Sequence, residues 1–463
     1  MDRPSSLFPT FTMNRVVAIL ALVPATLLAQ LRGEALRTKI DSIISAPIRA
    51  GQVVGASVAV VRGRDTLLVK GYGKANIELD VATPAAGTAI YEIGSITKQF
   101  TGAAVMQLVE QGKLSLDDDV TKYLPTFKTG GRRVTIRRLL DHTSGMRSYT
   151  EIAAARNFFA LPLPRDTMLR VVENQPWDFE PGEEQIYNNS AFFLVGLVIE
   201  KVAGMPYADY VKQHLFDRAG MPNAHYCSET AIRRGKTSGY DFDATGPIQK
   251  RPLSHQWPYA AGSLCMTVRD LVAWNEALHR STKLMSAASY KEMTRPDTLN
   301  DGYRVGYAKG LALTPVAGHP SLHHGGGING WTTDNLYFPQ ESLSVVVFYN
   351  TSGPSGPGEA AEAIAKAVLG EKPPVAVPVT GDPTRFRGTF AGRGRGVPQQ
   401  VGIEVTDGRV EVVRGAQRRP LVHVGNGTFM LGATKFVFAE QGGRVVSLRI
   451  DGGSGNNVLR PRP

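Results

Sequence analysis

Cysteine is nearly absent from this chain of 463 residues, which contains only Cys227 and Cys265. A framework of several disulfides, as small secreted domains use, is therefore excluded. One bridge and two half-buried free thiols both remain open, because sequence does not establish that the two residues are neighbours. The chain also lacks the CxxC and HExxH spacings of common zinc sites, so we expect no metal and no cofactor.

Nucleic-acid recognition motifs are missing as well, although the net charge is +11. The segment from Asp382 to Pro463 contains 13 Lys and Arg against 6 Asp and Glu, and therefore carries most of the excess. Basic residues without interleaved aromatics or a known motif do not indicate a nucleic-acid partner. We instead predict a solvated basic face near an anionic cell envelope.

Long apolar runs are absent except near the N-terminus, where Arg15 precedes the run Val16 to Leu28. A basic residue, a short apolar core and a small residue at the exit, Ala29, are typical of a signal peptide. We therefore predict a signal peptide over residues 1–30 and a secreted or periplasmic protein. The run is short for a bilayer, so no stable membrane span is expected after cleavage, and an uncleaved anchor is the alternative.

The rest of the chain divides into three segments. Region 31–370 has strand-like runs at both ends and helical periodicity between them, which predicts an antiparallel sheet assembled from both ends with a helical insertion. The runs are 56–61, 66–69, 331–338 and 343–349 for strands, and 95–111, 191–202, 268–278 and 359–369 for helices. Residues 371–382 are a proline-rich linker, and the short alternating runs of 383–463 predict a small all-β domain.

The sequence Gly94-Ser95-Ile96-Thr97-Lys98 opens the strongest predicted helix. Residues three apart on a helix share a face, so Ser95 and Lys98 would be neighbours. A serine hydroxyl becomes a good nucleophile when a base takes its proton, and a lysine can do so if burial and the helix N-terminus lower its pKa. The Ser95 amide could also point at a developing oxyanion. The alternative is that Ser95 only caps the helix.

Two further stretches complement this pair. In Tyr187-Asn188-Asn189, a tyrosine or tyrosinate could shuttle protons, and the Asn189 amide could bind both the lysine and a substrate carbonyl. His324-Gly325-Gly326-Gly327 lies before a strand, where glycines permit close backbone approach and an extended substrate could add as a strand. The Gly327 amide could complete the oxyanion hole. The alternatives are a core aromatic in a turn and a glycine-rich turn with an incidental histidine.

Together, several stretches resemble one known family: Tyr91–Lys98, Leu139–Met146, Tyr187–Asn189, Ala261–Leu264 and His324–Trp331. The region from about 53 to 370 resembles the serine β-lactamase and penicillin-recognising family, in its class C-like branch. That branch includes class C β-lactamases, D-Ala-D-Ala carboxypeptidases, D-aminopeptidases and family VIII esterases. The resemblance implies an α+β, β-lactamase/transpeptidase-like fold, an antiparallel sheet with helices on both faces plus an all-helical subdomain. Segment 383–463 resembles the small β-barrel appendages of some members.

The resemblance also implies residue roles. Ser95 would be the acylated nucleophile, with Lys98 and Tyr187 as general base and acid. The substrate-binding residues would be Asn189, His324, Gly325, Gly326 and Gly327. Classical class C β-lactamases have lysine where His324 stands, and histidine is mostly neutral at pH 7, which disfavours a β-lactam carboxylate. His142 belongs to a stretch that is structural in the family, and we assign it packing or turn support.

These observations predict a serine hydrolase that acts through a Ser95 acyl-enzyme. Its substrate would be a D-amino-acid peptide, a peptidoglycan-derived fragment or a small ester, with β-lactamase activity as the alternative. A non-catalytic envelope binding protein with the same fold is the alternative from another class. The sequence carries no prediction of oligomeric state.

Overall fold

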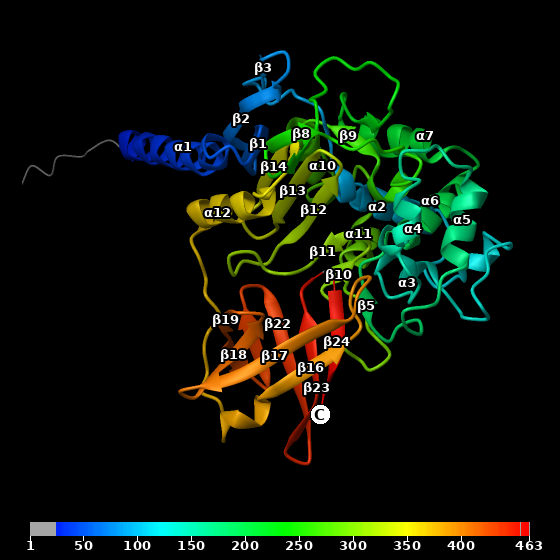
Figure 1. Ribbon diagram of the computed structural model, residues 1–463. Helices are drawn as coiled ribbons and strands as arrows, with labels where there is room; N and C mark the ends of the chain where they lie inside the picture. Colours follow the sequence, from blue (N-terminus) through cyan, green and yellow to red (C-terminus); the bar gives the residue numbers. More distant parts are fainter. Residues whose placement is uncertain (1–24, 454, 463) are drawn as a thin grey trace, which may run out of the picture.

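The computed structural model describes residues 25–453 and 455–462, which form a larger part with a central sheet and a smaller β-domain (Figure 1). The strands of the central sheet are β1 (Gly55–Arg62), β2 (Asp65–Asn76), β3 (Val81–Ala82), β10 (Tyr307–Ala308), β11 (Leu311–Ala312), β12 (Leu322–Ile328), β13 (Trp331–Phe338) and β14 (Leu343–Tyr349). They are antiparallel and lie in the order β10-β11-β12-β13-β14-β1-β2-β3. The prediction of a sheet built from both ends of this region is therefore confirmed.

Both faces of this sheet are covered, because successive side chains of its central strands point to opposite faces and pack into two different cores. In β1, Val58 and Val60 pack into one core, whereas Ala59 packs into the other. In β14, Val347 and Val346 divide in the same way. Two-sided burial produces the continuous apolar runs of these strands. Helices α1 (Ala25–Arg49) and α12 (Pro357–Leu369) cover one face, and α2 (Thr97–Glu110) and α10 (Val268–His279) cover the other.

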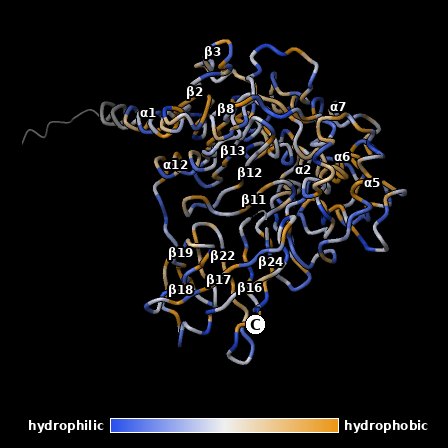
Figure 2. The backbone as a smooth tube through the Cα atoms, in the orientation of Figure 1, coloured by the Kyte–Doolittle hydropathy of each residue, from blue (hydrophilic) through white to orange (hydrophobic). Residues whose placement is uncertain are grey.

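The helical subdomain lies beyond α2, and hydrophobic residues concentrate there and on the sheet (Figure 2). Its helices are α3 (Ile136–Leu140), α4 (Ala153–Arg156), α5 (Arg165–Glu173), α6 (Asn189–Ala203), α7 (Tyr207–Val211), α8 (Asp217–Ala219), α9 (Tyr259–Gly262) and α11 (Ala287–Met293). The Asn188 side chain caps α6 by accepting a hydrogen bond from the Ala191 amide at 3.0 Å, as polar N-caps do. Within the described ranges, no single helix is long and apolar enough to cross a membrane. One bent pair of helices, Asn189–Ala203 with Tyr207–Ala219, has the length and composition of a membrane span, and these two properties alone suggest it.

Shorter elements complete this part of the chain. One small sheet contains β4 (Tyr91–Glu92), β9 (Leu264–Met266) and β6 (His225–Tyr226), and another contains β15 (Thr351–Ser352), β7 (Tyr240–Asp243) and β8 (Gly246–Gln249). In the first, Cys227, which follows β6, and Cys265 of β9 form a disulfide. The pairing that the sequence left open is thereby decided in favour of one bridge. Of the predicted signal peptide, residues 1–24 lie outside the described residues and 25–30 belong to α1.

The C-terminal domain is all-β, as predicted. After residues 370–380, which contain neither helix nor strand, its strands are β16 (Gly388–Gly392), β17 (Gln399–Thr406), β18 (Arg409–Arg414), β19 (Gln417–Pro420), β20 (Val422–Gly425), β21 (Thr428–Leu431), β22 (Thr434–Gln441), β23 (Arg444–Asp451) and β24 (Gly455–Pro461). The path of paired strands runs from β19 to β20. A single residue, Leu421, joins these two end strands, so the sheet curls into a barrel-like form around a phenylalanine-rich core.

The junction between the two parts is built from backbone pairing and ion pairs. Strand β24 pairs with β5 (Gln185–Ile186), the short strand immediately before Tyr187. Arg393 forms a 3.0 Å ion pair with Glu184, and Arg449 pairs with Asp301. The basic C-terminal segment was expected to be a solvated face. Arg449 departs from this expectation, because its side chain is only 12% exposed and pairs with Asp301, whereas Arg393 stays half exposed while it binds Glu184.

Candidate active site

Ser95 lies in a 3₁₀ turn, Gly94–Ile96, that runs into α2. The N-cap of α2 is Ile96, so the alternative in which Ser95 only caps the helix is not what the structure contains. Gly94 has φ +53°, and a Cβ there would lie 2.7 Å from the Gly327 amide nitrogen. Glycine is therefore required at position 94, because a side chain there would prevent the turn of Ser95 from packing against strand β12.

Lys98 projects from the first turn of α2 to the Ser95 hydroxyl. Its Nζ donates to Asn189 Oδ1 at 2.8 Å and to the Ala261 carbonyl at 2.8 Å, and it lies 3.2 Å from Ser95 Oγ. A neutral amine has two N–H groups and one lone pair. When Asn189 and Ala261 accept the two N–H groups, the lone pair is left for the serine proton. The arrangement is therefore that of a base poised on Ser95.

The charge state of Lys98 follows from its surroundings. Its side chain is completely buried, and burial lowers its pKa well below 10.5, with a smaller contribution from the positive charge of Arg395. Within the described residues, no carboxylate forms an ion pair with Nζ; the two fixed acceptors are an amide oxygen and a carbonyl. The site thus accepts the hydrogen bonds of the Lys98 amine but places no negative charge beside Nζ that would favour the protonated form.

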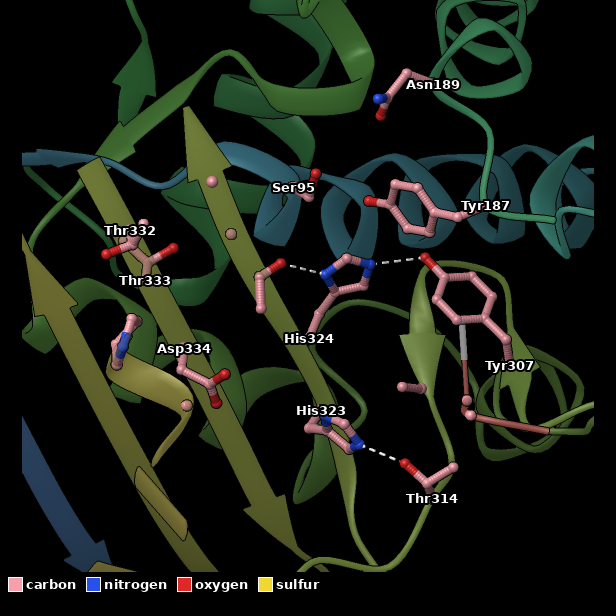
Figure 3. Close-up of a pocket in the computed structure, with 18 of the residues that line it drawn as sticks. Ser95, Tyr187, Asn189, Tyr307, Thr314, His323, His324, Thr332, Thr333 and Asp334 are labelled. Carbon is pink, nitrogen blue, oxygen red and sulfur yellow. Dashed lines mark hydrogen bonds between the residues drawn. The ribbon is translucent and has the colours of Figure 1, made fainter. Parts of the chain in front are cut away.

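Tyr187 lies beside this pair, and Figure 3 shows its hydroxyl pointing toward Ser95. Lys98 Nζ is 4.7 Å from the centre of its ring. Burial raises the Tyr187 pKa, and the Ser95 hydroxyl offsets only part of this effect. The side chain is therefore a neutral phenol, which selects tyrosine over tyrosinate between the two forms that the sequence left open. A neutral phenol is a proton donor in this position.

His142 supports Tyr187 from behind, as expected for a packing residue. Its ring centre lies 4.4 Å from that of Tyr187, and its Nδ1 accepts the Asn188 amide at 3.1 Å. Complete burial is the main cause that lowers its pKa well below 6.5, so the ring is neutral. His142 thus holds the loop before α6 in place.

His324 projects from β12 toward the same space. Its Nδ1 lies 2.6 Å from the Gly325 carbonyl, which can only accept, so Nδ1 carries the proton. Its Nε2 is then an acceptor for the Tyr307 hydroxyl at 2.8 Å (Figure 3). Burial is the main cause that lowers the His324 pKa to about 3. The prediction that this position lacks a permanent cation agrees with this environment.

The three glycines after His324 line a strand edge. Strand β11 pairs with β12 only between Ala312 and His323, so within the described residues Gly325–Ile328 has a strand partner on one side, β13. A Cβ on Gly326 would lie 2.0 Å from the Ile93 carbonyl, whereas Gly327 has open space around it. Gly326 is therefore required for packing, and Gly325 and Gly327 leave the edge accessible to an extended substrate.

Two cavities meet at Ser95. The larger, about 590 Å³, is lined by Tyr187, His324, the three glycines and Arg395. The smaller, about 130 Å³, is lined by aromatic and apolar side chains that include Tyr149, Phe159 and Trp257. Its size is similar to that of a cavity of about 150 Å³ that holds a benzene ring. Ser95, Thr150, Asn189 and Gly327 border both cavities, so Ser95 lies where the larger cavity and the aromatic one meet.

Comparison with known proteins agrees with this arrangement. The Beta-lactamase family matches residues 40–369. The chain belongs to the β-lactamase family. D-aminopeptidase from Brucella anthropi is 29% identical over 320 residues, which are 68% of this chain and 59% of that protein. The chain spans only about three fifths of the length of the curated relatives that it matches.

Two solved structures of the family share the fold. The octameric penicillin-binding protein homologue from Pyrococcus abyssi is 25% identical with a TM-score of 0.64, covering 91% of this chain and 99% of its own. The D-stereospecific amidohydrolase from Streptomyces sp. is 27% identical with a TM-score of 0.63, covering 72% of this chain and 99% of its own. The β-lactamase family, the D-aminopeptidase and the D-stereospecific amidohydrolase are serine hydrolases.

As a β-lactamase family member, the chain brings all its predicted site residues together, but sequence reasoning missed several groups. Tyr307, which donates to His324, lies in a two-residue strand without a recognisable pattern. The Ala261 carbonyl was missed because a backbone acceptor has no sequence signature, although the stretch 261–264 was noted. Arg395 comes from the β-domain, 300 residues after Ser95, and no local signal links the two.

Proposed function

We propose that this chain is a serine hydrolase that cleaves amide or ester bonds through an acyl-enzyme on Ser95. The observation that carries the proposal is the position of Lys98 Nζ, which has two fixed acceptors and Ser95 Oγ as its third neighbour. A salt-bridged structural lysine would have a carboxylate there, and a charged lysine has no lone pair. The arrangement supports proton removal from Ser95.

In the acylation step, Ser95 Oγ bonds to the substrate carbonyl carbon and its proton moves to Lys98. The leaving nitrogen or oxygen takes a proton from the Tyr187 hydroxyl, and Tyr187 recovers one from Lys98. The amides of Ser95 and Gly327 would donate to the oxyanion. In deacylation, water adds to the acyl carbon, its proton passes to the same bases, and Ser95 Oγ leaves with a proton. No metal or cofactor takes part in this scheme.

The two cavities support an assignment of substrate ends. The proton donor must face the leaving group, and Tyr187 lines only the larger cavity. The leaving group would therefore occupy the larger cavity and the acyl side chain the smaller, aromatic one. A D-amino-acid peptide or a small ester with one apolar side chain satisfies this division. The relatives named as a D-aminopeptidase and a D-stereospecific amidohydrolase support a D-configured substrate.

The site of action would be outside the cytoplasm, in the periplasm or the medium. The basic and apolar residues of 1–30 support export, and the Cys227–Cys265 disulfide is of the kind that persists in oxidising compartments. A peptidoglycan-derived peptide is then an available substrate. This location is tested by N-terminal sequencing of the protein recovered from a fractionated culture, and recovery of uncleaved chain in the cytoplasm would contradict it.

The function is tested with a substrate panel: p-nitrophenyl esters, D-Ala-D-Ala peptides, D-amino-acid amides and nitrocefin. We expect turnover of a peptide, amide or ester that Ser95→Ala abolishes. Faster turnover of nitrocefin than of all other substrates would favour the β-lactamase alternative. No turnover, with no covalent adduct from a fluorophosphonate or a labelled penicillin, would favour a non-catalytic binding protein.

A further inference from the structure

Arg395 is the one cationic side chain that borders the larger cavity, among the described residues, and it comes from the C-terminal domain. It lies in the loop between β16 and β17. Its guanidinium carbon is 5.0 Å from the centre of the Tyr187 ring. A side chain of the appended domain therefore lies against the residue that faces the leaving group.

The loop is fitted to this position on both sides. Arg393 pairs with Glu184, and Arg395 Nε donates to Glu151 Oε1 at 2.8 Å. Gly396 has φ +75°, and a Cβ there would lie 2.7 Å from a Glu151 carboxylate oxygen. Glycine at this position permits the close approach that brings Arg395 over the cavity.

Arg395 retains donors for a ligand. Of its five N–H groups, one is used on Glu151, and a second makes a long 3.4 Å contact with Thr150 Oγ1. The side chain is 46% exposed and lines the cavity, so its remaining donors are accessible to a ligand there. A guanidinium with free paired donors suits a planar carboxylate, which it binds with two parallel hydrogen bonds.

No other cation lines this cavity in the described part of the chain. His324 is neutral, Lys98 is completely buried behind Ser95, and the only carboxylate lining the cavity is Asp334. Figure 3 shows Asp334 on β13, across β12 from Tyr187. A carboxylate on the leaving group would therefore meet Arg395 on the side of Tyr187, away from the Asp334 side chain.

We propose that Arg395 binds a carboxylate on the leaving group, so that the C-terminal domain makes the enzyme select substrates whose scissile amide is followed by a free carboxyl-terminal residue. The inference rests on the proposed function. It narrows the substrate class from amides in general to peptides that lose their last residue. The carboxylate of a β-lactam would meet the same arginine.

The test compares two substrates with the same scissile bond, an N-acyl D-Ala-D-Ala peptide and its C-terminal amide. For wild-type protein we expect higher kcat/KM on the free acid. Arg395→Gln should lower kcat/KM for the acid about 10-fold, mainly through KM, and change that for the amide less than about 2-fold, because a charge-assisted hydrogen bond is lost only with the acid. Arg395→Lys should retain part of the preference.

Arg418→Gln is the matched control, because it removes the same charge from the same domain at a position that does not line the cavity. It should leave the acid-to-amide ratio unchanged. Hydrolysis of a neutral p-nitrophenyl ester reports on folding and on Ser95 in each variant. An equal loss on both substrates, a wild-type preference for the amide, or an equal effect of Arg418→Gln would overturn the assignment, while continued ester turnover would show that the hydrolase is intact. Absence of ester turnover and of any Ser95 adduct would instead overturn the proposed function, and this inference with it.

Discussion

Replacing Asn189 by aspartate tests whether Lys98 acts as a neutral base. The substitution keeps an oxygen 2.8 Å from Lys98 Nζ but gives it a negative charge. At that distance, with an effective dielectric constant of about 20, the attraction is about 6 kcal/mol. The cost of burying the new carboxylate offsets part of this attraction. If half of the attraction remains, about 3 kcal/mol favours the protonated lysine. The neutral amine then becomes about 100-fold rarer at a given pH.

The assay is the pH dependence of kcat/KM for a p-nitrophenyl ester. In the wild type, burial lowers the Lys98 pKa, so the rate should rise and level off below the usual range of lysine. Asn189→Asp should move this rise to higher pH and recover activity at the alkaline end. Asn189→Ala, which removes the acceptor without adding charge, should lower the plateau without an alkaline shift. An Asn189→Asp profile that is unshifted, or reduced equally at every pH, would refute the neutral base.

Three further predictions concern stability and the surroundings of the site. Replacing both Cys227 and Cys265 by serine opens a loop of 38 residues and should cost about 4 kcal/mol of unfolding free energy, measured by denaturant titration; a loss below about 1 kcal/mol would contradict it. Tyr307→Phe removes the donor to the buried His324 Nε2. It should lower the free energy of unfolding by about 1–3 kcal/mol and also lower kcat/KM. An unchanged melting temperature with unchanged kcat/KM would count against that hydrogen bond. Burial raises the Asp334 pKa to about 7, above its unfolded value, so its contribution favours the folded state at low pH and is lost as the pH rises toward 7. Asp334→Asn should therefore raise the melting temperature at pH 8 relative to wild type more than at pH 4, and a gain that is equal at both pH values would be inconsistent with this titration.

The sequence predicted the parts of the site that follow local rules. Ser95 and Lys98 are three residues apart on one helix, and the strands at 331–338 and 343–349 have continuous apolar runs because both faces are buried. The family resemblance then supplied Tyr187, Asn189 and His324, and the fold brings all five residues together. Their chemical roles stay predictions until the variants are measured.

The groups that sequence did not predict act through space rather than along the chain. Ala261 contributes a carbonyl, Tyr307 lies in a two-residue strand, and Arg395 depends on how a second domain docks. The basic C-terminal segment illustrates the same limit. Its charge suggested a solvated surface, whereas Arg393 and Arg449 bind carboxylates across the domain junction, and only the fold brings those partners within reach.

The central claim is that Ser95 forms the covalent intermediate with Lys98 as its base. The most direct measurement is rapid quenching during turnover of a p-nitrophenyl ester, followed by peptide mass spectrometry. We expect the acyl group on the peptide that contains Ser95, its accumulation slowed at least about 100-fold in Lys98→Ala, and none in Ser95→Ala. An acyl group on another residue, or turnover that persists in Ser95→Ala, would contradict the account.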